Sequence, residues 1–564
     1  MDDPEAQPRQ SRFRRLKRWA RIRRALLLVI LAAALTFDIS IAFYLNTQPL
    51  GGDAKVYSRI AVNVIDHGVF SPEEQPDQNG EFRPSIIRLP GYPLFLAGIY
   101  SAAGKENYPA VRAVQAVLHF LSALMAAFIA FLWVGGKKRR RRKAAVWTFL
   151  LAAFCPFTAN YSAMLLTEVP TIFLMTAMML TATLAIRAAS LKRSLLWWAV
   201  AGLAGGLAVE IRPDSGLFAF ALGLTMIVAA VSVRPFKNVI VPFVIKGAVF
   251  SLAFVIVLVP WTIRNEQVFG MFQPLAPEYA AAPDEFLPRG YFHWLRTWVN
   301  DFKYVSPTQW ELEIRRIDID KLPASAFDND EERARVTALI DQYNNSDPDH
   351  PLVPKRPADD ESTNDSDEAD SDNDSDHDSA DDESADNNDD QNQELDLHIS
   401  PEADAEFEKI AEQRVARYPL RYYVFLPAER AATMWFDTHS DFYPFGGELF
   451  PLTDLDTDVH QDIWLPLFVF IDIIYTIIGV AGLVLLWTSG WPRTHIWVFM
   501  ALALIITRVV LFSTLENPEP RYLIELFFIT AILGGIAVSR TKFECGKGSL
   551  GLRIYYGRDR KRTA

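Results

Sequence analysis

The sequence is poor in cysteine, with two in 564 residues. Cys155 lies in an apolar run and Cys545 in a polar C-terminal stretch, so no disulfide framework is expected. The sequence also lacks a Walker-type phosphate loop, a dinucleotide-binding fingerprint, an HExxH motif and a CxxC motif. Its histidines are scattered without metal-ligand spacing, and His119, inside an apolar run, is expected to be a packed residue. These absences give no support to a soluble nucleotide-binding domain, a zinc peptidase site or a thiol redox site.

Positive charge is missing from one long segment. From Pro357 to Leu397 there are 19 Asp and Glu residues and no Lys or Arg, whereas the whole chain has a net charge of -12. Without this segment, 49 acids face 56 bases, a net charge of +7. Its low hydrophobicity and dense like charge predict disorder. It lacks the spaced Gly and Glu of an EF-hand loop, so a solvated arm is favoured over a calcium site.

Apolar residues make up 50% of the chain, and the mean hydropathy is +0.08. They gather in blocks of roughly 20 residues, long enough to cross a hydrocarbon core of about 30 Å. The first block is too long for a cleavable signal peptide and is expected to remain as a membrane helix. The sequence therefore predicts an all-α polytopic membrane protein of about ten spans: 25–45, 109–134, 145–163, 168–187, 195–211, 214–233, 244–262, 462–487, 495–514 and 521–539. Two pairs of neighbouring spans, one around Glu168 and one around Arg212, are separated by only a few residues, so each pair could be a broken or re-entrant helix.

Basic residues fall on one side of this ten-span arrangement, at 12–24, 137–143, 192–193, 234 with 237, and 540–562. The positive-inside rule makes that side cytoplasmic. The chain is expected to begin with a basic cytoplasmic N-terminus (1–24), the first span (25–45) and an outer loop with juxtamembrane helices (46–108). Spans two to seven (109–262) lead to an outer α or α+β domain (263–461) that contains the acidic insertion (357–397). Spans eight to ten (462–539) and a basic cytoplasmic tail (540–564) follow.

Polar residues at the expected outer ends of the spans are the candidates for chemistry, because charge at membrane depth is costly without a cavity or a partner. Asp53 follows the first span. After it, Val56, Ile60 and Val64 have helical spacing, which predicts an amphipathic helix on the membrane surface. Asp53 is either an N-cap of this helix or a catalytic base.

Arginines mark other outer ends. Arg88 precedes a rigid Pro-Gly-Tyr-Pro turn and a short apolar helix over 94–99, and it is either a phosphate ligand or a snorkelling interfacial residue. Arg264 ends the seventh span, where an ordinary flanking charge is the simpler interpretation. Arg521 precedes the last apolar run. Two lone charges are, taken singly, more simply structural: Glu168 and Arg212.

Several motifs occur in one order and cover nearly all of the spans. They are GGDAKVYSRIA with DHGVFS, RLPGYPLFLAGIY, LLTEVPTIF, GGLAVEIRPDSG, PWTIRNEQVFGMF and EPRYLIELFFI. In this order they resemble the GT-C-type polytopic glycosyltransferases, the group that includes protein O-mannosyltransferases and the lipid A aminoarabinose transferase. The sequence departs from that pattern at Ala54, where the family often has a second acid, and at Leu89, where it often has a proline.

The resemblance implies a GT-C-like bundle and an inverting transfer of a sugar from a polyprenyl-phosphate donor on the outer face of the membrane. It implies that Asp53 matches the catalytic carboxylate and that Arg88 matches the basic residue at the donor phosphate. Further residues at the donor phosphate would be Arg264, Arg521 and Tyr522. Other candidates to line the site are Tyr57, Tyr92, Glu168 and Arg212.

Elementary chemistry agrees with those roles, since an inverting transfer needs a base for the acceptor hydroxyl and positive charge on the departing phosphate. The acceptor is left open between protein, lipid and polysaccharide, and no nucleic acid partner is expected. A divalent cation is left open as a cofactor, because a lone Asp53 is a poor metal site. In a bacterium the site would lie at the plasma membrane and face the periplasm or exterior; in a eukaryote the membrane would be the endoplasmic reticulum.

Two other classes compete with this hypothesis. A transporter or flippase of a lipid-linked anionic substrate would use the same arginines, but it requires neither a long outer domain nor a surface helix. A membrane scaffold would display the acidic arm without catalysis. Deletion of Asp359 to Asp396 separates the scaffold from the enzyme, because the enzyme should keep its transfer activity.

Overall fold

The computed structural model describes residues 25–43, 51–233, 237–281, 285–348, 395–436, 459–491, 493–546 and 549–554. The chain divides into two compact units. Unit 1 comprises residues 1–286, 431–513 and 519–564, and unit 2 comprises residues 287–430 and 514–518. The predicted basic N-terminus, Arg234, most of the acidic insertion and the end of the tail lie outside the described residues.

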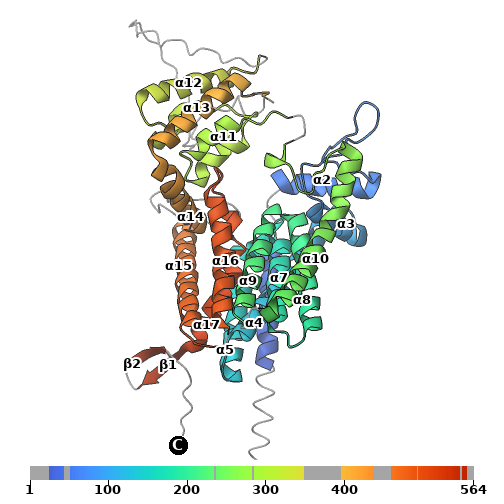
Figure 1. Ribbon diagram of the computed structural model, residues 1–564. Coiled ribbons are helices and arrows are strands. Elements are labelled where there is room, and N and C mark those ends of the chain that lie inside the picture. Colours follow the sequence, from blue (N-terminus) through green and yellow to red (C-terminus); the bar gives the residue numbers. More distant parts are fainter. Residues whose placement is uncertain are drawn as a thin grey trace, which may run out of the picture. The chain divides into compact units, whose positions relative to one another are not determined.

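Unit 1 is built from long helices that run side by side (Figure 1). They are the first helix Ala25–Phe43, α2 (Gly52–His67), α3 (Gly91–Ala103), α4 (Tyr108–Trp133), α5 (Lys138–Ala153), α6 (Pro156–Ala159), α7 (Glu168–Arg187), α8 (Leu191–Ile211), α9 (Gly216–Val231), α10 (Lys237–Phe269), α15 (Val459–Trp487), α16 (Thr494–Ser513) and α17 (Leu526–Arg540). Short helical turns join some of them: η1 (Asn160–Ser162), η2 (Pro213–Ser215), η3 (Glu278–Ala280) and η11 (Pro520–Leu523).

Eight of the described helices are long and apolar enough to cross a membrane. A ninth candidate is α5 together with Pro156–Ser162, two pieces that meet at an angle of 53°. α17 is a shorter apolar helix. The chain is therefore a multi-pass membrane protein with an all-helical body, as predicted, and the count of ten spans remains a prediction.

The broken span is the one predicted at 145–163. α7 begins at Glu168 and α8 ends at Ile211, and each is a continuous helix. The chain bends instead between α5 and α6, where Pro156 occupies the first turn of α6. A proline has no backbone N–H with which to continue the hydrogen bonds of α5.

A buried polar contact ties the first helix to the bundle. The fully buried His119 of α4 lies 3.0 Å from Asp38 of the first helix (Nδ1 to Oδ1) and 2.8 Å from Thr158 of α6 (Nε2 to Oγ1). A carboxylate inside a helical bundle needs such a partner, because an unpaired buried charge is costly. His119 is a packed residue, as predicted.

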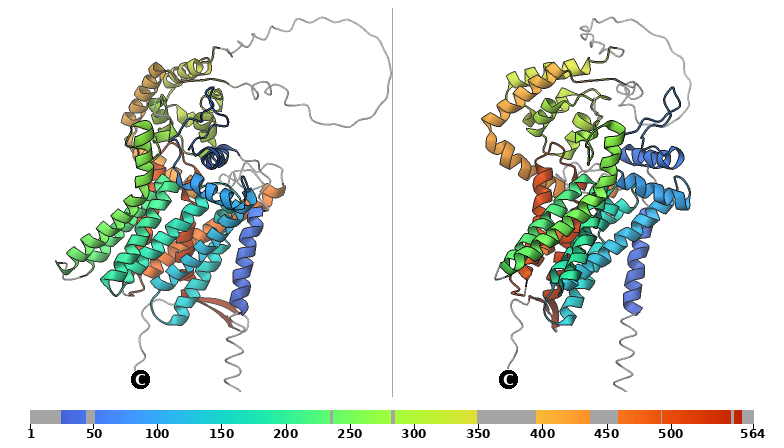
Figure 2. Two further views of the ribbon diagram at one scale, coloured as in Figure 1. Left: turned by 90° about the vertical axis from the view of Figure 1, so that its right-hand side faces the viewer. Right: turned by 45° about the vertical axis from the view of Figure 1, so that its right-hand side comes forward.

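Two shorter helices, α2 and α3, lie at one end of this bundle, which we call the α2 end (Figures 1 and 2). The apolar face of α2 packs through Ile60 against Phe70, Leu89 and Trp261. α3 follows the Pro-Gly-Tyr-Pro turn. Both helices were predicted from the sequence, and both predictions are confirmed.

The C-terminal part of unit 1 contains one element that the sequence analysis missed. β1 (Thr541–Gly546) and β2 (Ser549–Ile554) pair antiparallel, with Thr541 opposite Ile554. They form a two-stranded hairpin within the predicted tail.

The regular secondary structure in the described residues of unit 2 is all helical. It contains α11 (Arg289–Arg296), α12 (Asp330–Asn344), α13 (Pro401–Arg417) and the first part of α14 (Leu426–Phe436), with the turns η4 (Phe302–Tyr304), η5 (Ser306–Trp310), η6 (Ile319–Lys321), η7 (Ala324–Ala326) and η9 (Arg421–Phe425). Buried aromatic rings form its core, among them Trp294 of α11, Trp298 just after α11 and Phe407 of α13. Of the predicted α and α+β alternatives for this domain, the structure shows the α form.

Hydrogen bonds close the two ends of the insertion in unit 2. The backbone N–H of Asp396 donates to Asp347 Oδ2 at 3.1 Å, and that of His398 donates to Ser346 Oγ at 2.8 Å. The chain therefore returns after residue 394 to the place that it left after residue 348. These two hydrogen bonds join the described residues on either side of the insertion.

Replacement of residues 359–392 by a four-residue Gly-Ser linker should leave the thermal midpoint of the purified protein unchanged or slightly raised. A shorter loop loses less entropy on closure, and halving its length lowers that cost by about 0.6 kcal/mol. Differential scanning fluorimetry of the detergent-solubilised protein checks this. A lower midpoint, with loss of monodispersity, would show that the insertion supports unit 2.

Glycines on α8 let α10 approach closely. Gly202 and Gly206 lie four residues apart on the face that α10 covers. A Cβ on Gly206 would lie 2.6 Å from the carbonyl oxygen of Phe254 and 2.8 Å from Cβ of Val257. Small residues at such positions allow close backbone packing, which stabilises helix pairs where lipid supplies no hydrophobic driving force.

Gly206→Leu should lower the thermal midpoint, because forced separation of packed helices costs about 1–3 kcal/mol. Gly223→Leu is the matched control, since a Cβ at Gly223 of α9 meets nothing within 4 Å. Both substitutions replace Gly by Leu inside a helix and raise helix propensity equally. The difference between their thermal midpoints therefore measures the effect of packing against α10. Equal midpoints for the two variants, measured by size-exclusion thermal challenge, would contradict the packing argument.

Candidate active site

An ion pair joins two candidate residues at the α2 end of unit 1. Arg88 Nη2 donates to Asp53 Oδ1 at 2.8 Å, across 35 residues of sequence. Arg521 Nη2 lies 3.7 Å from the second oxygen of the same carboxylate. The Asp53 side chain is 29% exposed and that of Arg88 25% exposed, so the pair is open to incoming ligand. The buried Glu519 also pairs with Arg521, so two guanidinium groups lie against two carboxylates. A guanidinium has five N–H donors, so donors remain for an added anion.

Asp53 lies in the first turn of α2, whose N-cap is Gly51 without a side-chain capping bond. The N-cap interpretation of Asp53 is therefore wrong. The carboxylate still benefits from the positive end of the helix dipole, as expected for an acid in a first turn.

Tyr57 lies one turn after Asp53 on α2. Its ring packs edge-on against that of Tyr92, with 5.2 Å between centroids. Burial, and to a smaller extent the Asp53 carboxylate, raises the pKa of Tyr57 to about 12. Its hydroxyl therefore stays protonated at physiological pH and can donate a hydrogen bond but cannot serve as the base. The Tyr92 hydroxyl donates to Gln115 Oε1 of α4 at 2.9 Å, which fixes the ring that supports Tyr57.

The Pro-Gly-Tyr-Pro turn positions Arg88 through close backbone packing. Gly91 is the first residue of α3, and a Cβ there would lie 2.5 Å from the carbonyl oxygen of Glu210 and 2.8 Å from Cγ1 of Ile211. Only glycine allows α3 to start this close to the end of α8. Arg88 lies three residues before this contact, so the motif sets where its backbone runs.

A second group of charges is buried where α7, α8, α16 and α17 meet. Arg212 Nη1 lies 2.6 Å from Glu168 Oε1, and Arg212 Nε lies 3.2 Å from Asp214 Oδ1. Arg508 Nη2 lies 2.6 Å from Asp214 Oδ2 and 2.8 Å from Glu525 Oε2. None of the five side chains is more than 11% exposed. The structure thus joins Glu168 to Arg212 in a buried ion-pair network, which we call the buried network.

Sequence reasoning missed Arg508 and Glu525. Each is a lone charge inside an apolar run, and that pattern is the signal that would have found them, since such a charge needs a partner. Arg508 Nε also donates to the carbonyl oxygen of Tyr522. The Tyr522 ring stacks on Phe512 with 4.5 Å between centroids. The buried network therefore holds the turn η11, which carries Arg521 beside Asp53.

Arg264 lies in a different environment. Its Nη1 donates to the carbonyl oxygen of Ser85 at 2.9 Å, and its guanidinium carbon lies 4.8 Å from the ring centroid of Trp261 and 5.7 Å from that of Phe70. Cation–π contacts of this kind fix an arginine in place. Among the described residues its contacts do not include Asp53, so the structure does not join Arg264 to the Asp53–Arg88 pair.

Comparison with known proteins gives one family match. Residues 88–261 match the model of the family described as dolichyl-phosphate-mannose-protein mannosyltransferase. The matched segment begins at Arg88, ends at Trp261 and contains Glu168 and Arg212. No curated protein sequence matches the chain significantly.

Two solved structures show a weak likeness to the chain. One is ArnT from Cupriavidus metallidurans in the apo state, with a TM-score of 0.33 and 14% identity over 92% of this chain and 78% of that one. The other is the same protein bound to undecaprenyl phosphate, with a TM-score of 0.30 and 11% identity over 91% of this chain and 78% of that one. The family match over residues 88–261 is the firmer result. It confirms that this chain resembles the polytopic glycosyltransferases that its motifs predicted.

Proposed function

We propose that the protein is an inverting glycosyltransferase that moves a sugar from a polyprenyl-phosphate donor to an acceptor on the outer face of the membrane. The observation that carries the proposal is the Asp53 carboxylate held between Arg88 and Arg521. A base beside fixed positive charge is what such a transfer needs. The family that matches residues 88–261 is named for a sugar carried on a lipid phosphate, which supports the donor class.

In the proposed reaction, the acceptor hydroxyl attacks the anomeric carbon from the face opposite the phosphate. The bond between that carbon and the phosphate oxygen breaks, and polyprenyl phosphate leaves with the electron pair. Asp53 takes the acceptor proton, because Tyr57, with its pKa raised to about 12, cannot. Arg88 and Arg521 turn from the carboxylate to the phosphate, which frees the Asp53 oxygens for the acceptor.

The outer-face assignment is supported by charge. In unit 1 the turns between α4 and α5 and between α7 and α8 lead directly into the basic groups Lys138–Lys143 and Lys192 with Arg193, at the starts of α5 and α8. α4 and α7 each run from the α2 end to these turns, so the basic groups lie at the opposite end of the bundle from Asp53 (Figure 1). The positive-inside rule makes that opposite end cytoplasmic. The α2 end then faces outward, where an acceptor hydroxyl arrives from solvent and a lipid phosphate arrives from the bilayer.

Asp53→Asn should lower kcat by about 100-fold or more, the usual contribution of a general base. The purified protein in proteoliposomes is supplied with a panel of polyprenyl-phosphate sugars and with protein, lipid and polysaccharide acceptors, and new glycosides are quantified by mass spectrometry. Asp66→Asn is the matched control, because Asp66 is also on α2, is 28% exposed and pairs with Lys105. A wild-type rate for Asp53→Asn would sink the catalytic assignment. Transport of the donor without any new glycoside would instead favour a flippase.

Arg88→Gln should raise KM for the lipid donor about 10-fold or more, since it removes a charge-assisted contact with the phosphate. Arg59→Gln is its control: Arg59 is 24% exposed, close to the 25% of Arg88, and it pairs with Glu74, which is not a candidate site residue. An unchanged KM with a lower thermal midpoint would mean that Arg88 only anchors Asp53.

A further inference from the structure

Four basic side chains gather toward the end of unit 1 that lies opposite the α2 end. They are Arg141 of α5, Arg187 at the end of α7, Lys246 of α10 and Arg493 just before α16, and we call them the basic cluster. The charges of Arg141 and Arg493 act on Arg187, and that of Arg493 acts on Lys246. Like charges within this range repel each other unless an anion lies among them.

Backbone carbonyl groups at the ends of two helices hold the three arginines of the cluster. Arg141 Nε and Arg187 Nη1 donate, at 2.9 Å and 3.0 Å, to the adjacent carbonyl oxygens of positions 131 and 132 in the last turn of α4. Arg493 Nη1 donates to the carbonyl oxygen of Ile186 at 2.6 Å, in the last turn of α7. Because Ile186 directly precedes Arg187, these bonds bring the three guanidinium groups together.

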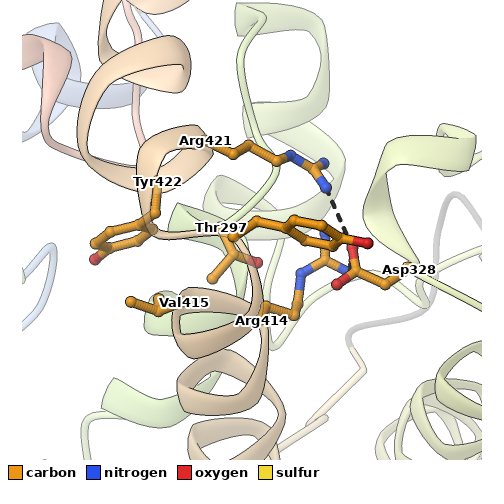
Figure 3. Close-up of a pocket in the computed structure, with 7 residues that line it drawn as sticks. Thr297, Asp328, Arg414, Val415, Arg421 and Tyr422 are labelled. Carbon is orange, nitrogen blue, oxygen red and sulfur yellow. Dashed lines mark hydrogen bonds and ion pairs between the residues drawn. The ribbon is translucent and has the colours of Figure 1, made fainter.

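The charge of the basic cluster is not offset by carboxylates nearby in the sequence. The segments 134–150, 184–200, 229–250 and 484–500 contain no Asp or Glu. The ends of α4 and α7 together contribute roughly one negative charge, against four formal positive charges. Figure 3 shows the contrasting case in unit 2, where Arg414 and Arg421 pair with Asp328. Charge complementarity therefore favours an added anion at the basic cluster.

The position of Lys246 indicates that this anion comes from the bilayer. Lys246 lies inside the apolar stretch Val239–Phe269 of α10, and Val241, Val244 and Leu252 of the same helix are exposed. Among the described residues it has neither a hydrogen bond nor an ion pair, although charge at membrane depth is costly without a partner. An anion that carries acyl chains covers both the charge and the apolar side chains, whereas a soluble anion covers only the charge.

We infer that the basic cluster binds the headgroup phosphate of an anionic phospholipid, whose acyl chains lie along α10. Arg187 and Arg493 are exposed, and each uses one of its five N–H groups for a carbonyl oxygen, so donors remain for phosphate oxygens. This lipid is not the donor of the proposed reaction, because the donor phosphate would lie at the opposite end of the bundle beside Arg88. The inference therefore does not rest on the proposed function.

The test titrates the delipidated full-length protein in a neutral detergent and follows bound lipid by native mass spectrometry. Phosphatidylglycerol and phosphatidylcholine with identical acyl chains differ in net charge, and inorganic phosphate has the anion without the chains. Phosphatidylglycerol should bind about 10-fold or more tightly than phosphatidylcholine, because only its phosphate charge is not already balanced. Equal affinity of the two lipids would overturn the role of the charge. Displacement of phosphatidylglycerol by an equal concentration of inorganic phosphate would overturn the role of the acyl chains.

Variants locate the site. Lys246→Gln and Arg187→Gln should each weaken phosphatidylglycerol binding about 10-fold and leave phosphatidylcholine binding unchanged. Arg139→Gln is the matched control, because it removes one charge from the same end of unit 1. Arg139 is exposed and lies two positions before Arg141 on α5, so the two side chains lie on different sides of that helix. An equal loss with Arg139→Gln would indicate diffuse attraction to surface charge and overturn the inference, as would undiminished binding in both cluster variants.

Discussion

Charge buried in a low-dielectric bundle must be neutralised, and this requirement organises the α2 end of unit 1. Arg508 is fully buried in α16, where an unpaired guanidinium would be prohibitively costly. Its partners Asp214 and Glu525 come from the α8–α9 turn and from the approach to α17, so neutralisation draws these segments together. Its bond to the Tyr522 carbonyl then sets the turn that brings Arg521 to Asp53. A buried network thereby supports the partly exposed pair of Asp53 and Arg88.

Much of this architecture follows from simple patterns in the sequence. Blocks of about 20 apolar residues can do little except cross a membrane as helices, because the backbone has no other way to satisfy its hydrogen bonds there. The helical spacing after Asp53 predicts α2, and the Pro-Gly-Tyr-Pro turn predicts α3. The sequence predicts that Asp53 and Arg88 lie at the same end of the bundle, but it does not predict their ion pair. Periodicity carries no information about contacts between residues 35 positions apart.

Other features depend on tertiary contacts that no local pattern records. The bend before Pro156 falls inside an apolar run that the sequence analysis predicted as one span. Hydropathy does not register the loss of a single backbone N–H. The guanidinium of Arg264 lies over the ring of Trp261 in a cation–π contact, which its place at the end of a span does not reveal. Arg421 pairs with Asp328 across 93 positions of sequence, so composition alone could not locate this ion pair.

The closed joint at Ser346, Asp347, Asp396 and His398 also bears on how the chain can change over generations. Loop closure costs rise only with the logarithm of length, so residues can be gained or lost between these anchors with little effect on the fold. Selection on stability then acts on Ser346 and Asp347, whose side chains accept these bonds from backbone N–H groups, and depends little on the length of the enclosed segment. The acidic tract is free to diverge faster than any helix around it, and related chains should differ there first.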